Sequence, residues 1–173
     1  AYSVTGWLGL QLPYYGEHVT LAWAPTAIAL AAIVHGGVMT TPGILVGAFS
    51  VNFAVDPSDA AHAAMIAVGN TLGPATAGLV LVRVCELRPQ LDRVRDAIAY
   101  VSIGVLGTSL LTATAGALSL YAFGDAPWAD VPTAWLAWLG GDAAGLLIIG
   151  PLLLTWLSAP DPNVSKALTL RER

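Results

Sequence analysis

Long stretches without charged residues dominate the pattern of the chain. No Asp, Glu, Lys or Arg occurs in residues 18–55, 60–82 or 97–124. An α-helix needs about 20 apolar residues to cross the hydrocarbon core of a bilayer. The two later stretches each have room for one such helix, and the first has room for two that separate at the glycine-containing segment 35–43. The pattern therefore predicts membrane-spanning helices.

The predicted fold is an all-α, polytopic bundle in a membrane. A last apolar run is interrupted only by Asp142, and the opening segment to about Tyr14 is apolar enough to span. We expect about six transmembrane helices, or five if the opening segment lies in the membrane interface. Segment 43–54 is short for a full crossing and is expected to tilt, break or lean on its neighbours. The expected helices cover about 1–14, 20–35, 43–54, 60–82, 97–122 and 133–158.

The composition agrees with a membrane protein and excludes several other classes. Hydrophobic residues make up 56% of the chain and charged residues only 10%, against about 25% charged in soluble domains. The single Cys excludes a disulfide scaffold, and a net charge of −4 excludes a basic nucleic-acid module. Because the apolar runs have helix length and do not alternate, a β-barrel is disfavoured. No initiator Met precedes the opening segment, which indicates part of a longer protein, and no basic region marks it as a signal peptide.

The basic residues predict which ends face the cytoplasm. All seven lie in two segments, 83–95 and 166–173, whereas the alternate loops carry only acids and histidines. Lys and Arg collect in cytoplasmic loops of membrane proteins. Six spans with both ends cytoplasmic satisfy this rule, and five satisfy it equally because the charges determine only the side of the C-terminus. We expect a transmembrane domain over 1–158 and a cytoplasmic tail over 159–173.

Asp142 is the sharpest candidate for function. A carboxylate near the centre of a spanning helix costs about 2.5–3.5 kcal/mol on insertion scales, and no predicted span contains a basic residue. Helical spacing places Trp135, Trp138 and Gly145 on the same face, which could form the wall of a pocket. The alternative is a structural acid bonded to hydroxyl groups of another helix, such as those of segment 108–114, with the tryptophans as interface anchors.

Two pairs of glycines four residues apart predict close helix packing. Gly69 and Gly73 flank Asn70 and Thr71, and Gly141 and Gly145 flank Asp142. Small residues at this spacing let a neighbouring helix approach closely, and a polar side chain can then hydrogen-bond across the contact. The repeated pattern suggests that these two helices touch each other. Asn52, at the end of segment 43–54, fits capping, packing or ligand contact equally well.

Common catalytic and metal-binding signatures are absent from the sequence. It contains no G-x-x-x-x-G-K-[ST], H-E-x-x-H, C-x-x-C or G-x-S-x-G motif, so neither catalytic residues nor a cofactor are predicted. His18 and His62 could form a metal-binding or pH-sensing cluster with Glu17, Asp56 or Asp59. Histidines in loops are more often simply solvated, and no metal site is predicted.

Several short motifs follow one another in an order that resembles a known family. They are Trp23-Ala-Pro-Thr-Ala-Ile-Ala-Leu30, Pro42-Gly-Ile-Leu-Val-Gly47, Gly69-Asn-Thr71, Thr112-Ala-Thr-Ala-Gly116, and Trp135-Leu-Ala-Trp-Leu-Gly-Gly-Asp-Ala-Ala-Gly145 running into Pro151. The order is similar to that of the first type of bacterial membrane-associated sensor domain, over about residues 23–157. The chain departs from the family at Ala24 and Ala27, where a proline and a glycine are usual. The family domain is also commonly longer.

The resemblance implies a non-enzymatic sensory module in the bacterial cytoplasmic (inner) membrane. Such a module passes a stimulus through its last transmembrane helix to an attached cytoplasmic histidine kinase or cyclic-di-GMP turnover enzyme. The expected partners are the lipid bilayer, this signalling domain and a second copy in a homodimer, with no nucleic acid, and no particular ligand is implied. The family's marked positions fall on Trp23, Pro25, Asn52, Gly69, Asn70, Thr71, Asp96, Gly116, Trp135, Trp138, Gly141, Asp142, Gly145 and Pro151.

The candidate site is a polar cluster between helices. Its expected members are Asp142, Trp135, Trp138, Asn70, Thr71, Asn52 and Trp23. An alternative function is the substrate-binding membrane subunit of a vitamin-type uptake transporter, in which Asp142 would contact the solute. The two functions predict different proteins, because a sensor continues into a cytoplasmic signalling domain and a transporter subunit stands alone.

Overall fold

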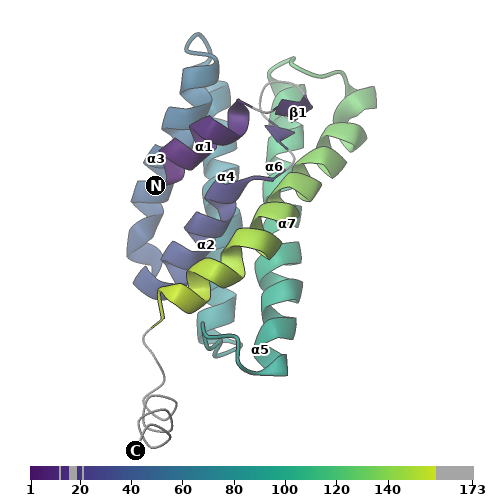
Figure 1. The fold of residues 1–173 in the computed structure, drawn as a ribbon. Helices are drawn as coiled ribbons and strands as arrows, with labels where there is room; N and C mark the ends of the chain where they lie inside the picture. Colours follow the sequence, from purple (N-terminus) through teal and green to yellow (C-terminus); the bar gives the residue numbers. More distant parts are fainter. Residues whose placement is uncertain (12, 16–18, 21, 159–173) are drawn as a thin grey trace, which may run out of the picture.

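The computed structural model describes residues 1–11, 13–15, 19–20 and 22–158. Its described part is a helical bundle with one small hairpin (Figure 1). The elements in chain order are α1 (Tyr2–Leu10), β1 (Pro13–Tyr15), β2 (Val19–Thr20), α2 (Ala24–Gly36), η1 (Val38–Thr40), α3 (Thr41–Val55), α4 (Ala60–Arg83), α5 (Val94–Ala99), η2 (Tyr100–Gly107), α6 (Thr108–Ala122), η3 (Trp128–Asp130) and α7 (Val131–Trp156). The strands are antiparallel, with Pro13 opposite Thr20.

The helical membrane fold predicted from the sequence is confirmed. Four continuous helical segments are long and apolar enough to cross a membrane: Val38–Val55, Ala60–Arg83, Val94–Ala122 and Trp128–Trp156. At 1.5 Å per residue, the nine residues of α1 reach only about 14 Å, well short of a bilayer core. α2 (Ala24–Gly36) is a shorter apolar helix of 13 residues, so the choice between six and five crossing helices stays a prediction. The predicted tail 159–173 lies outside the described residues.

The two helices predicted within the first uncharged stretch differ in length from expectation. The segment predicted over 20–35 begins only at Ala24, because Val19–Thr20 belongs to the hairpin, and α2 has 13 residues. The segment predicted over 43–54 is longer than expected, since η1 continues directly into α3. Pro42 lies in the first turn of α3. The N–H groups of the first turn have no partner within the helix, so a proline is tolerated there. The short helix is therefore α2.

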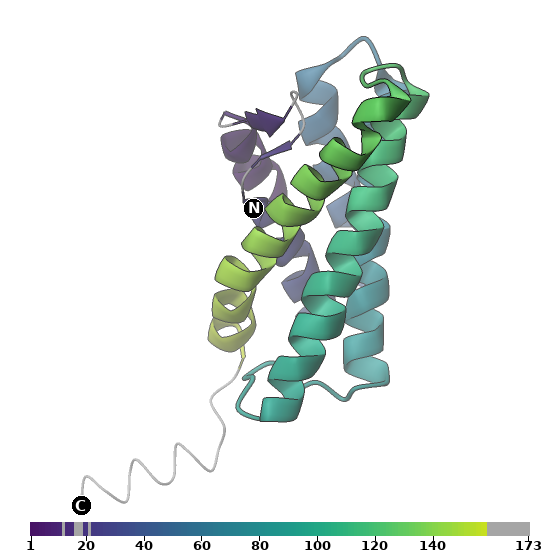
Figure 2. The same ribbon diagram turned by 90° about the vertical axis from the view of Figure 1, so that its right-hand side faces the viewer.

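The helices α4 and α7 occupy different positions in the bundle. α4 packs against α2, α3 and α6, whereas α7 packs against α2 and α6. Both views show α7 crossing the bundle at an incline to the long axis of α6 (Figures 1 and 2). The buried core between α2, α4, η2 and α7 includes Leu30, Leu81, Val105 and Leu146. Consequently α2 and α6 are the elements through which α7 is held.

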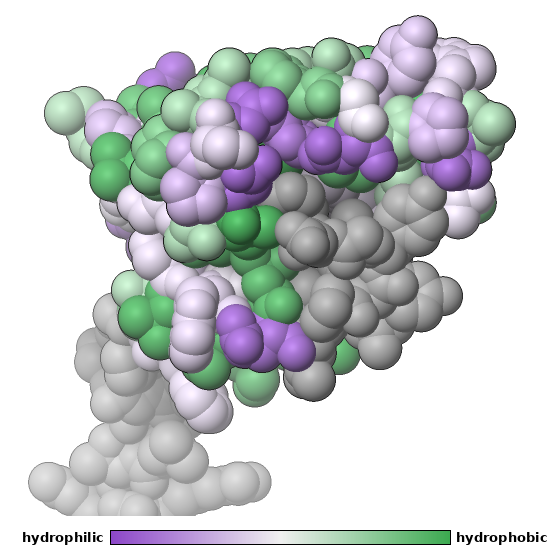
Figure 3. Space-filling view, turned by 90° about the horizontal axis from the view of Figure 1, so that it is seen from above, coloured by the Kyte–Doolittle hydropathy of each residue, from purple (hydrophilic) through white to green (hydrophobic). Residues whose placement is uncertain are grey.

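The polar connections lie at opposite ends of the bundle. The connection from α4 to α5, which contains Arg88 and Arg93 and is flanked by Arg83 and Arg95, lies at the same end as the last turn of α7 (Figure 1). The connections 56–59 and 123–130 lie at the other end, where hydrophilic residues form patches on the surface (Figure 3). This arrangement agrees with the charge pattern of the sequence, because the basic connection and the last turn of α7 lie at one end of the bundle.

Many large apolar side chains on the sides of the bundle are exposed. They include Val46 on α3, Leu72 on α4, Leu111 on α6 and Ile148 on α7. So many exposed large apolar side chains are unfavourable in water and are what a helix presents to lipid. With the helix lengths, this surface identifies a membrane protein.

Candidate functional site

Asp142 joins three helices. Its carboxyl group is completely buried in the middle of α7. Oδ1 accepts a hydrogen bond from the Thr26 hydroxyl of α2 at 2.5 Å, and Oδ2 is hydrogen-bonded to the Thr112 hydroxyl of α6. The prediction that hydroxyl groups of segment 108–114 reach Asp142 is therefore correct for Thr112. Thr26 is a functional candidate that the sequence analysis did not identify.

The Thr112 hydroxyl lies within hydrogen-bond distance of three oxygen acceptors but can donate to only one of them at a time. It lies 3.1 Å from the Thr108 carbonyl oxygen and 3.2 Å from the Ser109 carbonyl oxygen, besides its bond to Asp142. A hydroxyl carries one proton and can donate only one strong hydrogen bond. If Asp142 is protonated, it donates to Thr112, which then donates to a carbonyl of its own helix. If Asp142 is ionised, Thr112 must donate to it. The site thus has two hydrogen-bonding arrangements that differ by one proton.

Trp23 brings the start of α2 against the middle of α7. Its backbone N–H donates to the carbonyl oxygen of Gly141 at 2.8 Å. A Cβ atom added to Gly145 would lie 2.3 Å from the Trp23 carbonyl oxygen, so only a glycine fits there. Pro25 lies in the first turn of α2. This close approach places Thr26, one turn further along α2, opposite Asp142.

Three further buried polar groups surround this contact. The Tyr2 hydroxyl lies close to the side chains of Trp23 and Asn70 and within electrostatic range of Asp142. None of the Tyr2 hydroxyl, the Trp23 Nε1 and the Asn70 Oδ1 makes a hydrogen bond of good geometry among the described residues. Trp23 and Asn70, both predicted site residues, therefore lie in the same polar cluster.

A comparison with protein families accounts for the order of the motifs. The family model for MASE1, a membrane sensory domain family, matches residues 1–172. The chain belongs to the MASE1 family. The resemblance inferred from the motifs is thereby confirmed over the whole chain. Comparisons with curated proteins and with solved structures found no match.

The two tryptophans of this MASE1 domain share the α6-facing side of α7 with Asp142, but neither has a described polar contact with the carboxyl group. Trp138 is buried against Gly116, where an added Cβ would lie 2.6 Å from the indole ring. Trp135 is only partly buried and donates from Nε1 to the Thr114 hydroxyl at 3.0 Å. They extend the α6–α7 contact towards one end of the bundle rather than lining a pocket at Asp142.

The glycine pairs of this MASE1 domain pack as predicted, but against different partners. Cβ atoms added to Gly69 and Gly73 would lie 2.4 Å from Ala115 and 2.6 Å from Thr112, so this pair admits α6. The other pair, at 141 and 145, receives the backbone of Trp23 instead. The expectation that the two glycine-bearing helices touch each other is wrong, because α2 and α6 carry the packing of α7 and the glycines of α4 face α6.

Two predicted members make only local polar contacts in the described part of the chain. The Thr71 hydroxyl donates to the Ala67 carbonyl oxygen of its own helix at 2.7 Å. The Asn52 amide donates to the Ala48 carbonyl oxygen at 2.9 Å, also within one helix. Both side chains are buried, which is the packing role weighed in the sequence analysis. These contacts attach neither residue to Asp142.

Asp96 is a second fully buried carboxyl group, at the opposite end from the hairpin. It lies in the first turn of α5, where the helix dipole favours a negative charge. Neither carboxyl oxygen has a hydrogen-bond partner among the described residues, and Arg95 Nε lies 3.7 Å from Oδ1. Asp96 is one of the positions marked by the family resemblance, but it has no contact with the Asp142 cluster in the described structure.

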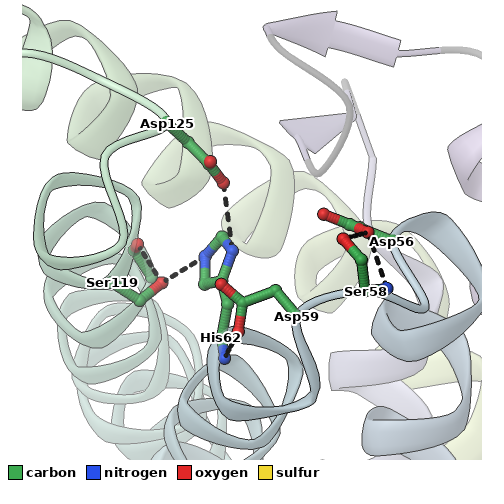
Figure 4. Close-up of polar contacts among 7 residues, drawn as sticks. Asp56, Ser58, Asp59, His62, Ser119 and Asp125 are labelled. Atoms are coloured by element: carbon green, nitrogen blue, oxygen red, sulfur yellow. Dashed lines mark hydrogen bonds and ion pairs between the residues drawn. The ribbon is translucent and has the colours of Figure 1, made fainter.

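His62 lies in a buried contact rather than in a solvated loop. Only 4% of it is exposed, and its Nδ1 lies 3.0 Å from Oδ2 of Asp125 (Figure 4). Its Nε2 lies 3.3 Å from the Ser119 hydroxyl. The order Asp125, His62, Ser119 resembles that of a hydrolytic triad, but Ser119 is fully buried and donates its proton to the Gly116 carbonyl oxygen at 2.7 Å. The serine therefore cannot meet a substrate in this arrangement.

The sequence analysis did not foresee the partners of His62. It weighed His18, Glu17, Asp56 and Asp59 because they lie near in the sequence; Glu17 and His18 lie outside the described residues. Asp59 caps α4 by accepting from the His62 backbone N–H at 2.8 Å. The described residues contain no group of three or more His, Cys, Asp or Glu that could hold a metal ion.

Proposed function

We propose that this chain is the sensory input domain of a bacterial signal-transduction protein. It lies in the cytoplasmic membrane as a multi-pass bundle and passes a stimulus through α7 to a cytoplasmic histidine kinase or cyclic-di-GMP turnover enzyme. The observation that carries the proposal is Asp142, a buried carboxyl group on α7 bonded to α2 and α6. Membership of a membrane sensory domain family supports it. Any catalysis belongs to the attached domain.

The Asp142 contact suits a two-state element. An ionisable group at membrane depth is costly and marks a functional site by default. Because α2, α6 and α7 meet at this one carboxyl group, any event that changes its hydrogen bonds changes how α7 is held. A stimulus shifts such an equilibrium only by its different affinity for the two states. The proposed input is therefore a ligand, proton or lipid change that favours one hydrogen-bonding arrangement of Asp142, Thr26 and Thr112.

The position of α7 supports its role as the output helix. It is the last described element, and its final turn lies at the end of the bundle that carries the arginines of the α4–α5 connection. This end is cytoplasmic by the positive-inside rule. A tilt or rotation of α7 at Asp142 would then move its cytoplasmic end. Outputs of these classes commonly work as dimers, so we also propose a homodimer.

The first test reads the gene beyond the codon for Arg173. A kinase, cyclase or phosphodiesterase domain in the same reading frame would support the proposal. A stop codon shortly after Arg173 would contradict it and favour the vitamin-type uptake subunit, whose members stand alone.

The second test measures the output of the full-length protein with Asp142→Asn. Asparagine has the size of aspartate and can still accept from Thr26 and donate to Thr112, but it cannot bind or release a proton. We expect normal amounts of protein in the membrane and a basal output displaced severalfold from wild type. Asp130→Asn, at an exposed position of η3, is the matched control and should leave output unchanged. If Asp142→Asn leaves the output unchanged, the proposal that the Asp142 contact transmits the stimulus is contradicted.

A further inference from the structure

The spanning segment Val94–Ala122 is not a regular α-helix along its whole length. Its middle part, η2, is a π-helix of eight residues, with α5 before it and α6 after it. A π-helix bonds N–H groups to the carbonyl oxygen five residues earlier, as the Thr108 N–H does with Ile103. Such helices are rare and occur mostly as single turns, frequently at functional sites. The eight residues of η2 therefore indicate a segment with a specific role.

Buried polar groups without a hydrogen-bond partner lie on both sides of η2. Thr108 and Ser109, the first two residues after it, are completely buried, and neither hydroxyl has a partner among the described residues. Before η2, neither carboxyl oxygen of the buried Asp96 accepts a hydrogen bond in the described structure, and Arg95 Nε lies 3.7 Å from one of them. An unpaired buried polar group costs free energy. The π form is therefore destabilised by polar groups on both of its flanks.

The π geometry accounts for the two unpaired hydroxyl groups. In an α-helix, a Ser or Thr hydroxyl can donate to the carbonyl oxygen four residues earlier, as that of Thr114 does in α6. For Thr108 and Ser109 those carbonyl groups belong to Gly104 and Val105, which lie within η2. A π-turn holds about one residue more than an α-turn, so these carbonyl groups are displaced. If η2 became α-helical, both hydroxyls would gain acceptors within their own helix.

Contacts with α7 hold η2 in the π form. Tyr100, its first residue, is buried and donates from its hydroxyl to the Leu146 carbonyl oxygen of α7 at 2.6 Å. The same hydroxyl occupies the space beside Gly150, where a Cβ atom would not fit. The ring also lies against Gly104, 3.0 Å from the position of a Cβ there. A turn of the helix about its axis at Tyr100 would break the contacts with α7.

We propose that η2 is a conformational switch between the π form of this structure and an α form in which Tyr100 leaves α7. The π form keeps the Tyr100 contact and leaves the hydroxyls of Thr108 and Ser109 unpaired. The α form pairs both hydroxyls and loses the Tyr100 contact. Because an α-turn holds about one residue fewer, α5 turns by about 100° relative to α6 when one turn changes form. The two forms thus exchange one set of polar contacts for another.

The switch links the Asp142 contact to the following part of α7. Thr112, which is bonded to Asp142, lies one turn after Thr108, whose carbonyl oxygen is one of its acceptors. Tyr100 contacts α7 at Leu146, one turn after Asp142. A change in η2 therefore alters how α7 is held between Asp142 and its last turn. The proposal goes beyond the proposed function and does not depend on it, because it concerns an equilibrium within this chain.

Distances between pairs of spin labels, measured by pulsed electron resonance on the full-length protein in lipid nanodiscs, test the switch. In a background without native cysteines, one label is placed at Ile98→Cys on α5 and the second at Val82→Cys on α4 or Leu152→Cys on α7, all at exposed positions. A turn of about 100° moves a side chain on the surface of a helix by roughly 8 Å. Because the two reference positions lie on different helices, such a turn changes at least one of the two distances. We expect wild type to show mainly one distance in each pair.

Two opposing changes identify the groups that set the balance. Tyr100→Phe removes the bond to α7, so a second distance should appear, with a population severalfold above that in wild type. Adding Thr108→Val and Ser109→Ala removes the gain of the α form and should return most molecules to the first distance. Tyr121→Phe, at an exposed tyrosine of α6, is the matched control and should keep the wild-type distances. The switch is contradicted if Tyr100→Phe also keeps them, or if its second distance persists when both hydroxyls are removed.

The thermal midpoint provides a measurement that needs no labels. Thr108→Val alone removes a buried, unpaired hydroxyl from the π form, so the midpoint should rise by roughly 2–4 °C. Thr114→Val, which removes a hydroxyl that donates to the Leu110 carbonyl oxygen, should not raise it. A midpoint that is unchanged or lower in Thr108→Val would show that its hydroxyl is not an unpaired group, and the proposal would be overturned.

Discussion

The backbone N–H of Trp23 donates a hydrogen bond to the carbonyl oxygen of Gly141, with the two atoms 2.8 Å apart. Main-chain contact between the start of α2 and the middle of α7 is available only because Gly145 has no side chain to fill the gap. One turn after Trp23, the Thr26 hydroxyl reaches the Asp142 carboxyl group. A backbone contact and a side-chain contact thus secure the same point of α7.

Gly145→Ala should weaken the contact of α2 with α7. The new Cβ would lie 2.3 Å from the Trp23 carbonyl oxygen, so the helices must separate. Overpacking of this kind costs typically about 1–3 kcal/mol. The control is Gly140→Ala, because nothing lies within 4 Å of a Cβ at Gly140. It should be neutral or raise stability by up to about 1 kcal/mol through helix propensity. Unfolding in detergent measures both, and equal effects would contradict the predicted contact.

Thr26→Val and Thr112→Val should each destabilise the bundle. Each change removes a hydroxyl group that bonds to the buried Asp142, and interhelical hydrogen bonds in membranes contribute about 0.6 kcal/mol on average and up to about 1.7. Thr71→Val is the matched control, because its hydroxyl bonds only within its own helix. Thr26→Ser should recover most of the loss. A loss no larger than that of Thr71→Val would show that the bonds to Asp142 add no stability.

Tyr100 and Gly150 should be coupled in a double-mutant cycle. The Tyr100 hydroxyl donates to the Leu146 carbonyl oxygen at 2.6 Å and occupies the space beside Gly150, where an added Cβ would lie 1.8 Å from it. Gly150→Ala should therefore destabilise the protein strongly. In the background of Tyr100→Phe, which lacks the hydroxyl oxygen, the same change should cost less by roughly 0.5–3 kcal/mol. Additive effects in thermal unfolding would argue against this close approach.

The connection between α4 and α5 should face the cytoplasm. In a Cys85→Ala background, single cysteines are introduced as Arg88→Cys in that connection and as Ser58→Cys between α3 and α4, both at exposed positions. A membrane-impermeant maleimide added to intact spheroplasts should label Ser58→Cys only, and lysis should expose Arg88→Cys. Labelling of Arg88→Cys in intact cells would reverse the orientation predicted by the positive-inside rule.

The lengths of the uncharged runs were enough to predict most helices. The spans expected over 60–82, 97–122 and 133–158 correspond to Ala60–Arg83, Val94–Ala122 and Val131–Trp156. This works because the bilayer demands long apolar helices and penalises charge, and both are local properties of the chain. The same penalty identified Asp142. The hairpin that shortens α2 was not foreseen, since nothing in an uncharged run distinguishes the end of a strand from the start of a helix.

The sequence by itself thus determined a helical membrane protein, its family motifs and the one acid in the middle of a span. Only the tertiary structure decided what that acid touches. Thr26 and Asp142 are 116 residues apart, and His62 meets Ser119 across 57. Thr26 is the only residue of α2 with a hydroxyl group, and this could have marked it as a partner for Asp142. The chain contains many other hydroxyl groups, however, and no local rule selects among them. Which pairs meet depends on how the helices pack, and that depends on the shapes of all their faces together.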